Sequence, residues 1–552
     1  MASYDVIFLH PPSFAEYGKK PWFPGPIART VGIFSPLFIM IPFGVLSIAE
    51  HLVKNGFRVK IVNLAERMLT VPSCTIASLV KDLDSRVFAI DLHWGIHSDG
   101  AVRTAEICKQ LHPNSSVILG GLTASYFSQE IMKSSRSVDG IIRGEAEEAM
   151  VALVDSLIKN GKLGEVPNLT FRDSNDRVRA NPQVRPRSNL DDYDYTNLSL
   201  IEPRNRLLSL TIGSRTLQVW NLPVCRGCAF NCITCGGSQY ADRRILMREK
   251  PAFRSARRMV EDFQRLDEQG INYVFLFQDC RLGTKAYYED LLKSLHKEKW
   301  SKIEHVSLEL FNPVDDEFIR YLAANKPADT IALTFSPESG SDEVRRAFGR
   351  NYTNQAILET NIKCATSSIP IDFHFMIALG QESPETLKEM WSLWDKIMSR
   401  KTPTFFTSVD FGPMVLLDPG SIAYENPTRF GYRMLFTTFN EIREALSSPS
   451  WVGWINYETR YLTRDQLVQS IFETTEVWID LYEKYGLFNQ ERAYDERIKL
   501  RLEKGITREV QRALKYPDVE ERSQKLKELD QIYRDPLLAY SYVLTAEEKS
   551  VP

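Results

Sequence analysis

Short apolar runs alternate with amphipathic stretches along residues 1–165 of the chain. The runs DVIFLH (5–10), FRVKIVNLA (57–65) and SSVILGG (115–121) have the length and composition of buried strands. Between them, stretches such as PFGVLSIAEHLVKNG (42–56) place apolar residues at helical spacing. This alternation of strand and helix predicts an α/β domain with a doubly wound parallel sheet.

A second alternating block follows residues 166–205, a segment rich in Pro, Asn, Asp and Arg that predicts a linker with a small hairpin. From RTLQVWNLPVC (215–225) to FTSVDFGPM (406–414), six apolar runs are separated by helical stretches. The pattern predicts a partial (β/α)6 barrel of the TIM type over residues 206–430, with its site at the carboxyl ends of the strands. Residues 431–552 are charged and helical in pattern, which predicts a helical C-terminal region packed on the barrel.

Length and composition fit a protein of several domains. The chain has 552 residues, of which 43% are hydrophobic and 25% charged, and its net charge is −3. No basic block supplies the phosphate-neutralising charge of a nucleic-acid-binding protein, so we expect no nucleic-acid partner.

The apolar run at residues 32–49 is long enough for a membrane span, but Pro36 and Pro42 interrupt it and charged residues follow directly. It predicts a buried loop that leads into a core helix. The N-terminus lacks the basic start and apolar stretch of a secretory signal, so we expect a cytoplasmic protein. The scattered cysteines then read as small buried residues: Cys74, Cys108, Cys280 and Cys364.

Four cysteines cluster in the sequence CRGCAFNCITCGGS (225–238). A structural zinc site normally needs two cysteine pairs, which this chain does not offer. Cys228, Cys232 and Cys235 instead have the spacing C-x3-C-x2-C on the loop after the first barrel strand. Three thiolates can hold three irons of a 4Fe-4S cluster and leave the fourth iron open to a chelating ligand. Cys225 reads as a packed bystander.

This loop resembles that of the radical SAM enzymes, in which the open iron binds S-adenosyl-L-methionine. Two further segments are similar to that family: SPESGSDEVRRAFGRNYT (336–353) resembles its fourth-strand segment, and FMIALGQESPET (375–386) its glycine-rich turn after strand five. In the latter, Ala378 and Gly380 stand where Gly and Pro are usual. The likeness covers residues 215–420.

The resemblance implies contacts to S-adenosylmethionine. Glu338 and Ser339 are expected at its ribose or amino-acid part, and Arg345 or Arg346 at its carboxylate. Alternatively, these are solvated surface charges. The remaining expected contacts are Gln278 and Asp279 at the methionine amine, and Gly236 and Gly237, whose backbone approaches the cluster or forms a plain turn.

The front domain resembles the Rossmann-like cobalamin-binding domain of the cobalamin-dependent radical SAM methyltransferases, because four of its segments recur in the same order. Gly120 and Gly121 would let the nucleotide tail pass close to the backbone, and Thr123 and Ser125 would hydrogen-bond it. The further residues expected to contact the cofactor are His10, Pro11, Pro12, Ser13, His93, Trp94, Leu122, Gly144 and Glu145.

The segment Asp91-Leu92-His93 begins like the D-x-H-x-x-G motif of domains that ligate cobalt through histidine. Ile96 replaces the final Gly, and the segment follows a later strand than in those domains. We therefore expect that His93 does not ligate the cobalt. An alternative is that the domain has lost its cofactor and only shapes the site.

The resemblance implies methylation of an unactivated sp3 carbon, with an electron donor such as a ferredoxin or flavodoxin. Tyr457 and Glu458, in the aromatic segment 451–461, are candidate catalytic residues that contact the substrate. The segments 416–421 and 426–432 resemble those of archaeal-type members, so the expected substrate is a glutamine side chain of a protein, methyl-coenzyme M reductase. The alternatives are methylation or cyclisation of a small metabolite or lipid, and a non-catalytic cobalamin or redox protein.

Overall fold

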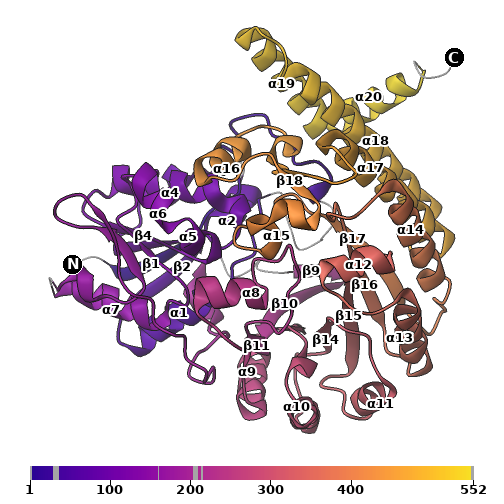
Figure 1. Ribbon diagram of the computed structural model, residues 1–552, viewed down its shortest axis with the longest axis horizontal. Helices are drawn as coiled ribbons and strands as arrows, with labels where there is room; N and C mark the ends of the chain where they lie inside the picture. Colours follow the sequence, from indigo (N-terminus) through magenta and orange to yellow (C-terminus); the bar gives the residue numbers. More distant parts are fainter. Residues whose placement is uncertain are drawn as a thin grey trace.

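The computed structural model describes residues 3–28, 37–71, 73–159, 161–202, 209–212 and 215–548. Within these ranges the chain forms two large sheets with helices packed on them, followed by a mainly helical C-terminal region (Figure 1). The predicted α/β fold class is confirmed. Residues 32–36, part of the apolar run predicted as a buried loop, lie outside the described residues.

The first sheet has the strand order β7-β6-β5-β4-β3-β1-β2-β8. Strand β1 pairs in parallel with β2 on one side and with β3 on the other, so the winding of the chain reverses at β1. Ligands bind at such a switch point, beyond the carboxyl ends of the strands. The strands are β1 Tyr4–His10, β2 Val59–Asn63, β3 Ser85–Asp91, β4 Ser116–Gly120, β5 Gly140–Ile142, β6 Leu169–Arg172, β7 Val178–Ala180 and β8 Ile201–Glu202.

Helices cover both faces of this sheet, with α1 packed beside α7 on one face and α3 beside α4 on the other (Figure 1). Helix α1 begins directly after Pro42 and ends at Asn55, where Gly56 takes a positive φ of 85°. The helices are α1 Phe43–Lys54, α2 Leu64–Thr70, α3 Ile76–Val80, α4 Ser98–Leu111, α5 Leu122–Tyr126, α6 Ser128–Ser134 and α7 Glu147–Ile158.

Part of the segment predicted as a linker belongs to the first sheet. Strands β6 and β7 form an antiparallel hairpin on the β5 edge, and β8 pairs in parallel with β2 at the opposite edge. The boundaries of the domains stay predictions.

The second sheet has the order β17-β16-β15-β14-β13-β10-β9. Strands β10 and β13 to β17 run parallel and curl into a half-barrel, and β9 adds an antiparallel edge (Figure 1). The six parallel strands are those predicted from the sequence. The strands are β9 Ser209–Ile212, β10 Arg215–Pro223, β13 Tyr273–Phe277, β14 His305–Leu310, β15 Thr330–Glu338, β16 Ile371–Ile377 and β17 Thr407–Pro413.

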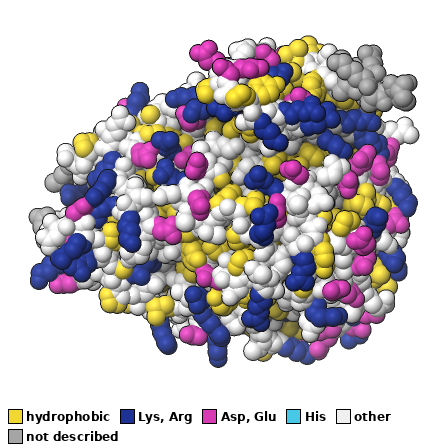
Figure 2. Space-filling view, turned by 45° about the horizontal axis from the view of Figure 1, so that its top comes forward, with side chains coloured by type: hydrophobic (Ala, Val, Ile, Leu, Met, Phe, Trp, Pro, Cys, Tyr) yellow, Lys and Arg dark blue, Asp and Glu magenta, His cyan; other side chains and the backbone are white. Residues whose placement is uncertain are grey.

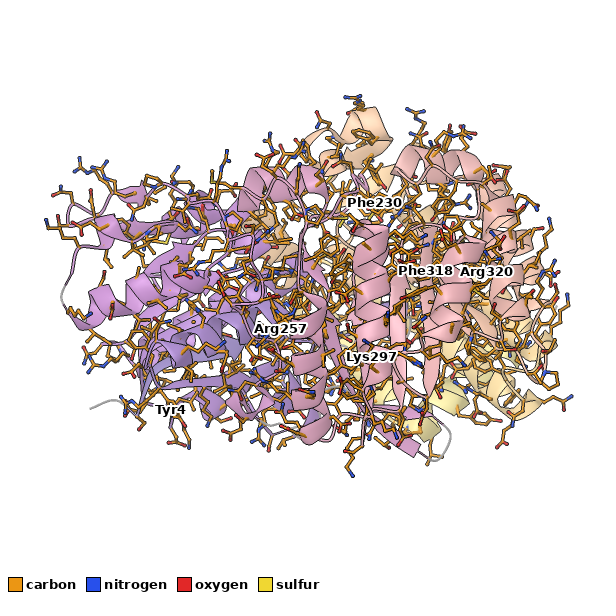
Figure 3. The ribbon with its side chains drawn as sticks, turned by 90° about the horizontal axis from the view of Figure 1, so that it is seen from below. Tyr4, Phe230, Arg257, Lys297, Phe318 and Arg320 are labelled. Atoms are coloured by element: carbon orange, nitrogen blue, oxygen red, sulfur yellow. The ribbon has the colours of Figure 1, made fainter. Side chains whose placement is uncertain are left out.

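The outside of the half-barrel is covered by helices. Figure 3 shows the helices that carry Arg257, Lys297 and Arg320 side by side along it. Helix α14 begins with a capping box between Ser383 and Thr386, and Pro384 takes its first turn. The helices are α9 Ala256–Glu268, α10 Lys285–Lys297, α11 Asp316–Ala324, α12 Asp342–Phe348, α13 Asn354–Thr366 and α14 Pro384–Met398.

The C-terminal region contacts both halves of the molecule. Helix α16 packs on α4 and α6 of the first domain, where the Phe439 amide donates to Glu130 at 2.9 Å, while α17 packs on α14 of the half-barrel. Its elements are α15 Ile422–Glu425, β18 Tyr432–Met434, α16 Phe439–Leu446, β19 Tyr457–Thr459, α17 Arg464–Lys484, α18 Gln490–Ala513, α19 Val519–Arg534 and α20 Pro536–Glu548. On the face shown in Figure 2, basic and acidic side chains are interspersed.

Candidate active site

A cavity of about 700 Å³ lies between the carboxyl ends of the two sheets. Its wall combines strand ends of the first sheet with the loop after β10 and strand ends of the half-barrel. The predicted site residues that line it are His93, Trp94, Gly120, Gly121, Leu122, Thr123, Gly144, Glu145, Cys228, Cys232, Cys235, Gly236, Gly237, Gln278 and Glu338.

The cysteine loop is held at both ends. After β10, Cys225 and Arg226 form the short strand β11 (Cys225–Arg226), which pairs with β12 (Ala252–Phe253). Farther along, the Ile233 amide donates to the Phe348 carbonyl at 3.0 Å. The loop therefore has a fixed path between the two domains.

The three cysteines of the C-x3-C-x2-C spacing, Cys228, Cys232 and Cys235, all line the cavity. The Phe230 amide points to Cys228 Sγ at 3.4 Å, and the Gly237 amide points to Cys235 Sγ at 3.3 Å. Such amides stabilise thiolate sulfur.

Burial raises the pKa of each of these thiols, that of Cys232 to about 12, although Arg350 opposes the rise at Cys228 and Cys232. The thiols are therefore protonated until a metal displaces the protons. Three sulfurs that converge on one cavity fit a 4Fe-4S cluster with an open iron. Cys225 also lines the cavity, and its thiol lies 3.8 Å from the Gly227 carbonyl.

Gln278 and Glu338 stand at the carboxyl ends of β13 and β15. Both have positive φ, 75° and 69°, which is rare for residues other than glycine and is frequent at functional sites. The Gln278 amide donates to Glu309 Oε2 at 2.7 Å, while its side-chain Oε1 is buried without a hydrogen-bond partner among the described residues. Burial raises the pKa of Glu338 and of Glu309 to about 7.

Arg350 lines the same part of the cavity and was not predicted from the sequence. Its guanidinium lies 3.7 Å from Glu338 Oε1 and over the rings of Phe230 and Phe311, 4.9 and 4.8 Å from their centroids. Its Nε is buried and has no partner in the described part of the chain. An unpaired N–H and an unpaired amide oxygen from residues that line one cavity suit a ligand that carries both a carboxylate and an ammonium group.

Four residues predicted to contact S-adenosylmethionine lie outside the cavity wall. Arg345 is buried and bonds Asp342 at 2.8 Å and the Tyr352 carbonyl at 3.1 Å, whereas Arg346 is exposed. Asp279 pairs with Arg281 at 2.7 Å. Ser339 is buried and accepts from the Ser341 amide at 3.1 Å. Their predicted roles stay predictions.

On the opposite wall, Gly120 and Gly121 end β4. A Cβ on Gly121, whose φ is 111°, would lie 2.7 Å from the Cα and N of His93, whereas a Cβ on Gly120 would meet nothing closer than 3.7 Å. Thr123 donates its hydroxyl to the His93 carbonyl at 3.0 Å. Ser125 accepts from the Gly144 amide at 2.9 Å, so the ends of β4 and β5 are tied together behind the wall. Because glycines have no side chain, a ligand can come close to the backbone along this wall, which fits the tail of a large cofactor.

His93 is neutral, because burial lowers its pKa to about 4. Its ring contacts Trp94, with 4.9 Å between the centroids. His10 lies behind the wall, where Nδ1 is 3.0 Å from Asp91 Oδ1 and Nε2 is 2.8 Å from the Phe38 carbonyl. Pro11, Pro12 and Ser13 are buried next to it and do not line the cavity.

A buried ion network joins the two walls. Arg248 donates to Glu145 at 2.6 and 2.8 Å, and Arg226 bonds Glu145 at 3.1 Å and Glu147 at 2.6 Å. Glu147 also accepts from Ser47 at 2.7 Å. Glu145 and Glu147 belong to the predicted crevice of the first sheet, so the network fixes that crevice against the cysteine loop.

Tyr457 and Glu458 lie outside the cavity wall. Tyr457 is buried and donates its hydroxyl to the Met414 carbonyl, and Glu458 pairs with Arg433. Met414 itself lines the cavity, so Tyr457 is linked to the cavity only through its hydrogen bond to the Met414 backbone. Their proposed contact with substrate stays a prediction.

Comparison with known proteins assigns each of the two sheets to a known domain family. The family model of the radical SAM superfamily matches residues 222–393, and that of the B12 binding domain matches residues 29–154. The chain therefore combines a radical SAM domain with a B12 binding domain, as in the cobalamin-dependent radical SAM enzymes that it resembles. The expected cofactors of this family, a 4Fe-4S cluster, S-adenosylmethionine and cobalamin, are thereby confirmed, and the residues that line the cavity fit them.

Individual relatives are distant. An uncharacterised methyltransferase from Pyrococcus horikoshii is 24% identical over 338 residues, 60% of this chain and 67% of the relative. The anaerobic magnesium-protoporphyrin IX monomethyl ester cyclase of Cereibacter sphaeroides is 22% identical over 57% of this chain, and this alignment spans only half of that cyclase.

The fold is shared with a solved structure. The cobalamin-dependent S-adenosylmethionine radical enzyme OxsB, with aqua-cobalamin and S-adenosylmethionine bound, covers 100% of this chain and is itself covered to 81%, with a TM-score of 0.56 and 14% identity. Among the described residues of the present radical SAM enzyme, no helix is long and apolar enough to cross a membrane.

Proposed function

We propose that this radical SAM enzyme methylates an unactivated sp3 carbon of a substrate held in the cavity between its two domains. The observation that carries the proposal is that the three cysteines and the crevice of the first sheet line one cavity. A hydrogen-abstracting centre and a methyl donor must reach the same substrate carbon, and a shared cavity permits this.

The protein supplies ligands and shape for its cofactors. Cys228, Cys232 and Cys235 would hold the cluster, and the Gly120–Gly121 backbone would border the cobalamin. When bound, the cluster with S-adenosylmethionine supplies hydrogen-atom abstraction, and cobalamin supplies the methyl group.

Gln278 and Arg350 would orient the amino-acid part of S-adenosylmethionine. The unpaired Gln278 Oε1 would accept from its ammonium group, and the unpaired Arg350 Nε would donate to its carboxylate. The guanidinium lies over the rings of both Phe230 and Phe311, so this donor is preorganised. Glu338, next to Arg350, would contact the ribose or the amino-acid part, as the resemblance implies.

The apolar part of the wall would exclude water from a reactive carbon centre. Trp94, Phe230, Phe277, Met376 and Met414 all line the cavity. Transfer of a hydrogen atom and of a methyl group needs no acid–base pair on the protein, and shielding is the contribution that these side chains make.

For the substrate we propose a glutamine side chain of a protein, methyl-coenzyme M reductase, with a ferredoxin or flavodoxin as electron donor. Leu416, Asp418 and Pro419, from the segment that resembles archaeal-type members, line the cavity, and Asp418 accepts from the Gly236 amide at 3.0 Å. The second candidate is methylation or cyclisation of a small metabolite or lipid, which the mainly apolar lining favours, as does the likeness to the magnesium-protoporphyrin IX monomethyl ester cyclase.

The test uses anaerobically reconstituted holoenzyme with methyl-labelled S-adenosylmethionine, incubated in parallel with glutamine-containing peptides and with lipid and tetrapyrrole extracts. We expect 5′-deoxyadenosine and one labelled methyl group on a carbon of the peptide. Label on a small molecule alone would replace the protein substrate by the second candidate. No 5′-deoxyadenosine with any substrate would contradict the catalytic proposal.

A further inference from the structure

The inner face of the half-barrel carries polar groups below the cavity. In β16 the buried residues Ile371, Phe373, Phe375 and Ile377 alternate with half-buried ones, and the half-buried Met376 lines the cavity. Because side chains of a strand alternate between faces, Asp372 and His374 lie on the same inner face as Met376. At about 3.3 Å per residue, His374 lies roughly 7 Å deeper in the barrel than Met376. Barrels of this type are usually filled by branched apolar side chains at this depth.

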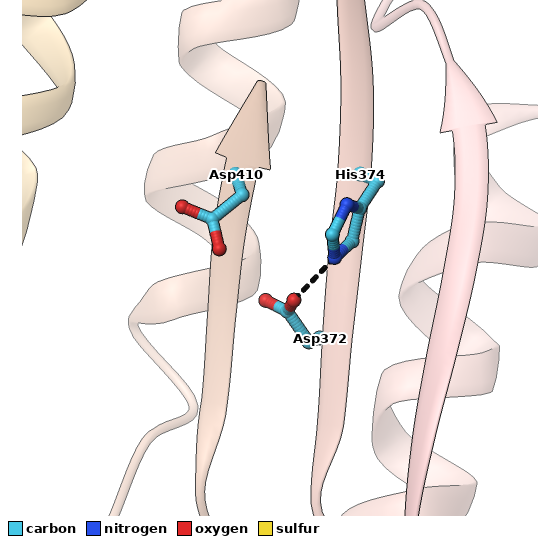
Figure 4. A group of neighbouring side chains, drawn as sticks. All are labelled: Asp372, His374 and Asp410. Atoms are coloured by element: carbon cyan, nitrogen blue, oxygen red, sulfur yellow. Dashed lines mark hydrogen bonds and ion pairs between the residues drawn. The ribbon is translucent and has the colours of Figure 1, made fainter. Parts of the chain in front are cut away.

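Asp372, His374 and Asp410 form a compact group on β16 and β17 (Figure 4). One ligand atom from each lies within 4.8 Å of the others. His374 Nε2 is 2.5 Å from Asp372 Oδ2, and Figure 4 shows both Asp410 and His374 turned toward Asp372.

Neighbouring hydroxyls orient the two carboxylates. Ser408 donates its hydroxyl to Asp372, and the Tyr482 hydroxyl of α17 lies 3.0 Å from the Val409 carbonyl and 3.4 Å from Asp410 Oδ1. Both carboxylates thus keep further lone pairs free toward the space between them. The side chains of Asp372 and His374 remain 26% and 37% exposed, so a small ligand can reach the group.

The group carries an excess of negative charge. Two carboxylates face one imidazole, and the next charged side chain along the inner face is the acidic Glu338 of β15, which also acts on His374. Among the described residues, neither Asp372 nor Asp410 forms an ion pair with a lysine or arginine. Two carboxylates set inside a barrel, with one imidazole as their only basic partner among the described residues, favour a bound cation.

We propose that Asp372, His374 and Asp410 bind one divalent transition-metal ion inside the half-barrel, at a site distinct from the cysteine cluster. Two carboxylate oxygens and one imidazole nitrogen are ligands typical of Mn²⁺, Fe²⁺ and Zn²⁺, and three protein ligands leave further coordination positions open. The site does not depend on the proposed methyl transfer.

The test titrates Mn²⁺ into tag-free holoenzyme, with its 4Fe-4S cluster reconstituted, and follows free Mn²⁺ by EPR. Mn²⁺ is chosen because thiolates bind it poorly, so the cysteine loop does not compete. We expect one Mn²⁺ per chain in the wild type, and roughly tenfold or greater loss of affinity in Asp410→Asn and in His374→Gln. The matched controls are Asp290→Asn on the outer surface of α10 and His305→Gln at the start of β14, which should bind like the wild type.

A second measurement identifies the ligand directly in the wild type. Pulsed EPR of Mn²⁺ bound to the wild type should show coupling to one imidazole nitrogen, and this coupling should be absent in His374→Gln. The proposal would be overturned if the wild type bound no stoichiometric Mn²⁺, or if the Asp410 and His374 variants bound Mn²⁺ as tightly as the wild type. Bound Mn²⁺ without nitrogen coupling would also overturn it.

Discussion

The crevice of the first sheet and the mouth of the half-barrel border the same cavity but present different chemistry to it. The first wall consists of the Gly120–Gly121 backbone, the ring of Trp94 and a neutral His93. The second presents the thiols of the cysteine loop, the carboxyl groups of Glu309 and Glu338, and the Arg350 guanidinium. A large macrocycle needs shape and close backbone approach, whereas a metal cluster and a charged amino-acid group need specific ligands. Each wall is suited to a different cofactor.

The largest expected effect is the loss of the cluster when a ligand cysteine is replaced, compared with no loss when another buried cysteine is replaced. Cys232→Ala should abolish the 4Fe-4S absorption and the cluster iron, because two sulfurs no longer fix the cube. Cys364→Ala, at a fully buried cysteine packed in the core, should retain both. The measurement is iron content and visible absorption after anaerobic reconstitution. Equal iron in the two variants would contradict the assignment of the cysteine wall.

Breaking the buried ion network between the two walls should have the next largest effect, a loss of stability. Arg248→Met removes a buried partner of Glu145, and breaking such a pair costs roughly 3–5 kcal/mol. The matched control, Arg136→Met, removes an exposed partner of Asp176 and should cost much less, because water screens exposed charges. Urea unfolding of both variants tests the difference. Similar losses would show that the network does not fix one wall against the other.

Arg350→Gln tests whether the Arg350 guanidinium binds S-adenosylmethionine. Loss of a charge-assisted hydrogen bond, worth about 1.5–3 kcal/mol, should weaken S-adenosylmethionine binding roughly 10- to 100-fold. Arg346→Gln, at an exposed position on α12, should leave the dissociation constant unchanged. Equilibrium binding to the reconstituted enzyme distinguishes them, and a larger effect at Arg346 would return the carboxylate to one of the two arginines predicted from the resemblance.

Gly121→Ala tests the backbone-lined wall and should have the smallest effect. Its positive φ and the 2.7 Å approach to His93 predict a cost of roughly 1–3 kcal/mol and reduced retention of cobalamin. Gly164→Ala, where an added Cβ meets nothing within 4 Å, should change stability by less than about 0.5 kcal/mol. Cobalamin content after gel filtration is the readout. Full retention in Gly121→Ala would mean that this backbone does not border the cofactor.

The sequence predicts the fold well where one local pattern decides it. Alternation of apolar runs gives both sets of parallel strands, and the cysteine spacing gives the cluster loop. A small hairpin was predicted for the segment that forms β6 and β7, but its addition to the β5 edge was not. Strand β8 escapes the pattern because it is short and its partner β2 is distant in the chain.

Which side chains line the cavity was harder to predict where a turn of the backbone decides their direction. Arg345 and Arg350 occur in one segment, and only the αL turn at Gly349 after helix α12 brings Arg350 to the cavity and leaves Arg345 behind it. Glu309 could have been noticed as an acidic residue inside an apolar run, HVSLELF. The pairing of Glu145 with Arg248 joins residues more than 100 positions apart, and no local pattern signals it.

The most direct test of the account measures whether the two walls hold their cofactors around one space. Holoenzyme prepared with cob(II)alamin and the reduced cluster should show magnetic dipolar coupling between the two centres in pulsed EPR, because both are expected to border a cavity of about 700 Å³. The coupling should disappear in Cys232→Ala and persist in Cys364→Ala. Bound cobalamin and a bound cluster with no magnetic interaction would contradict the central claim that one cavity serves both.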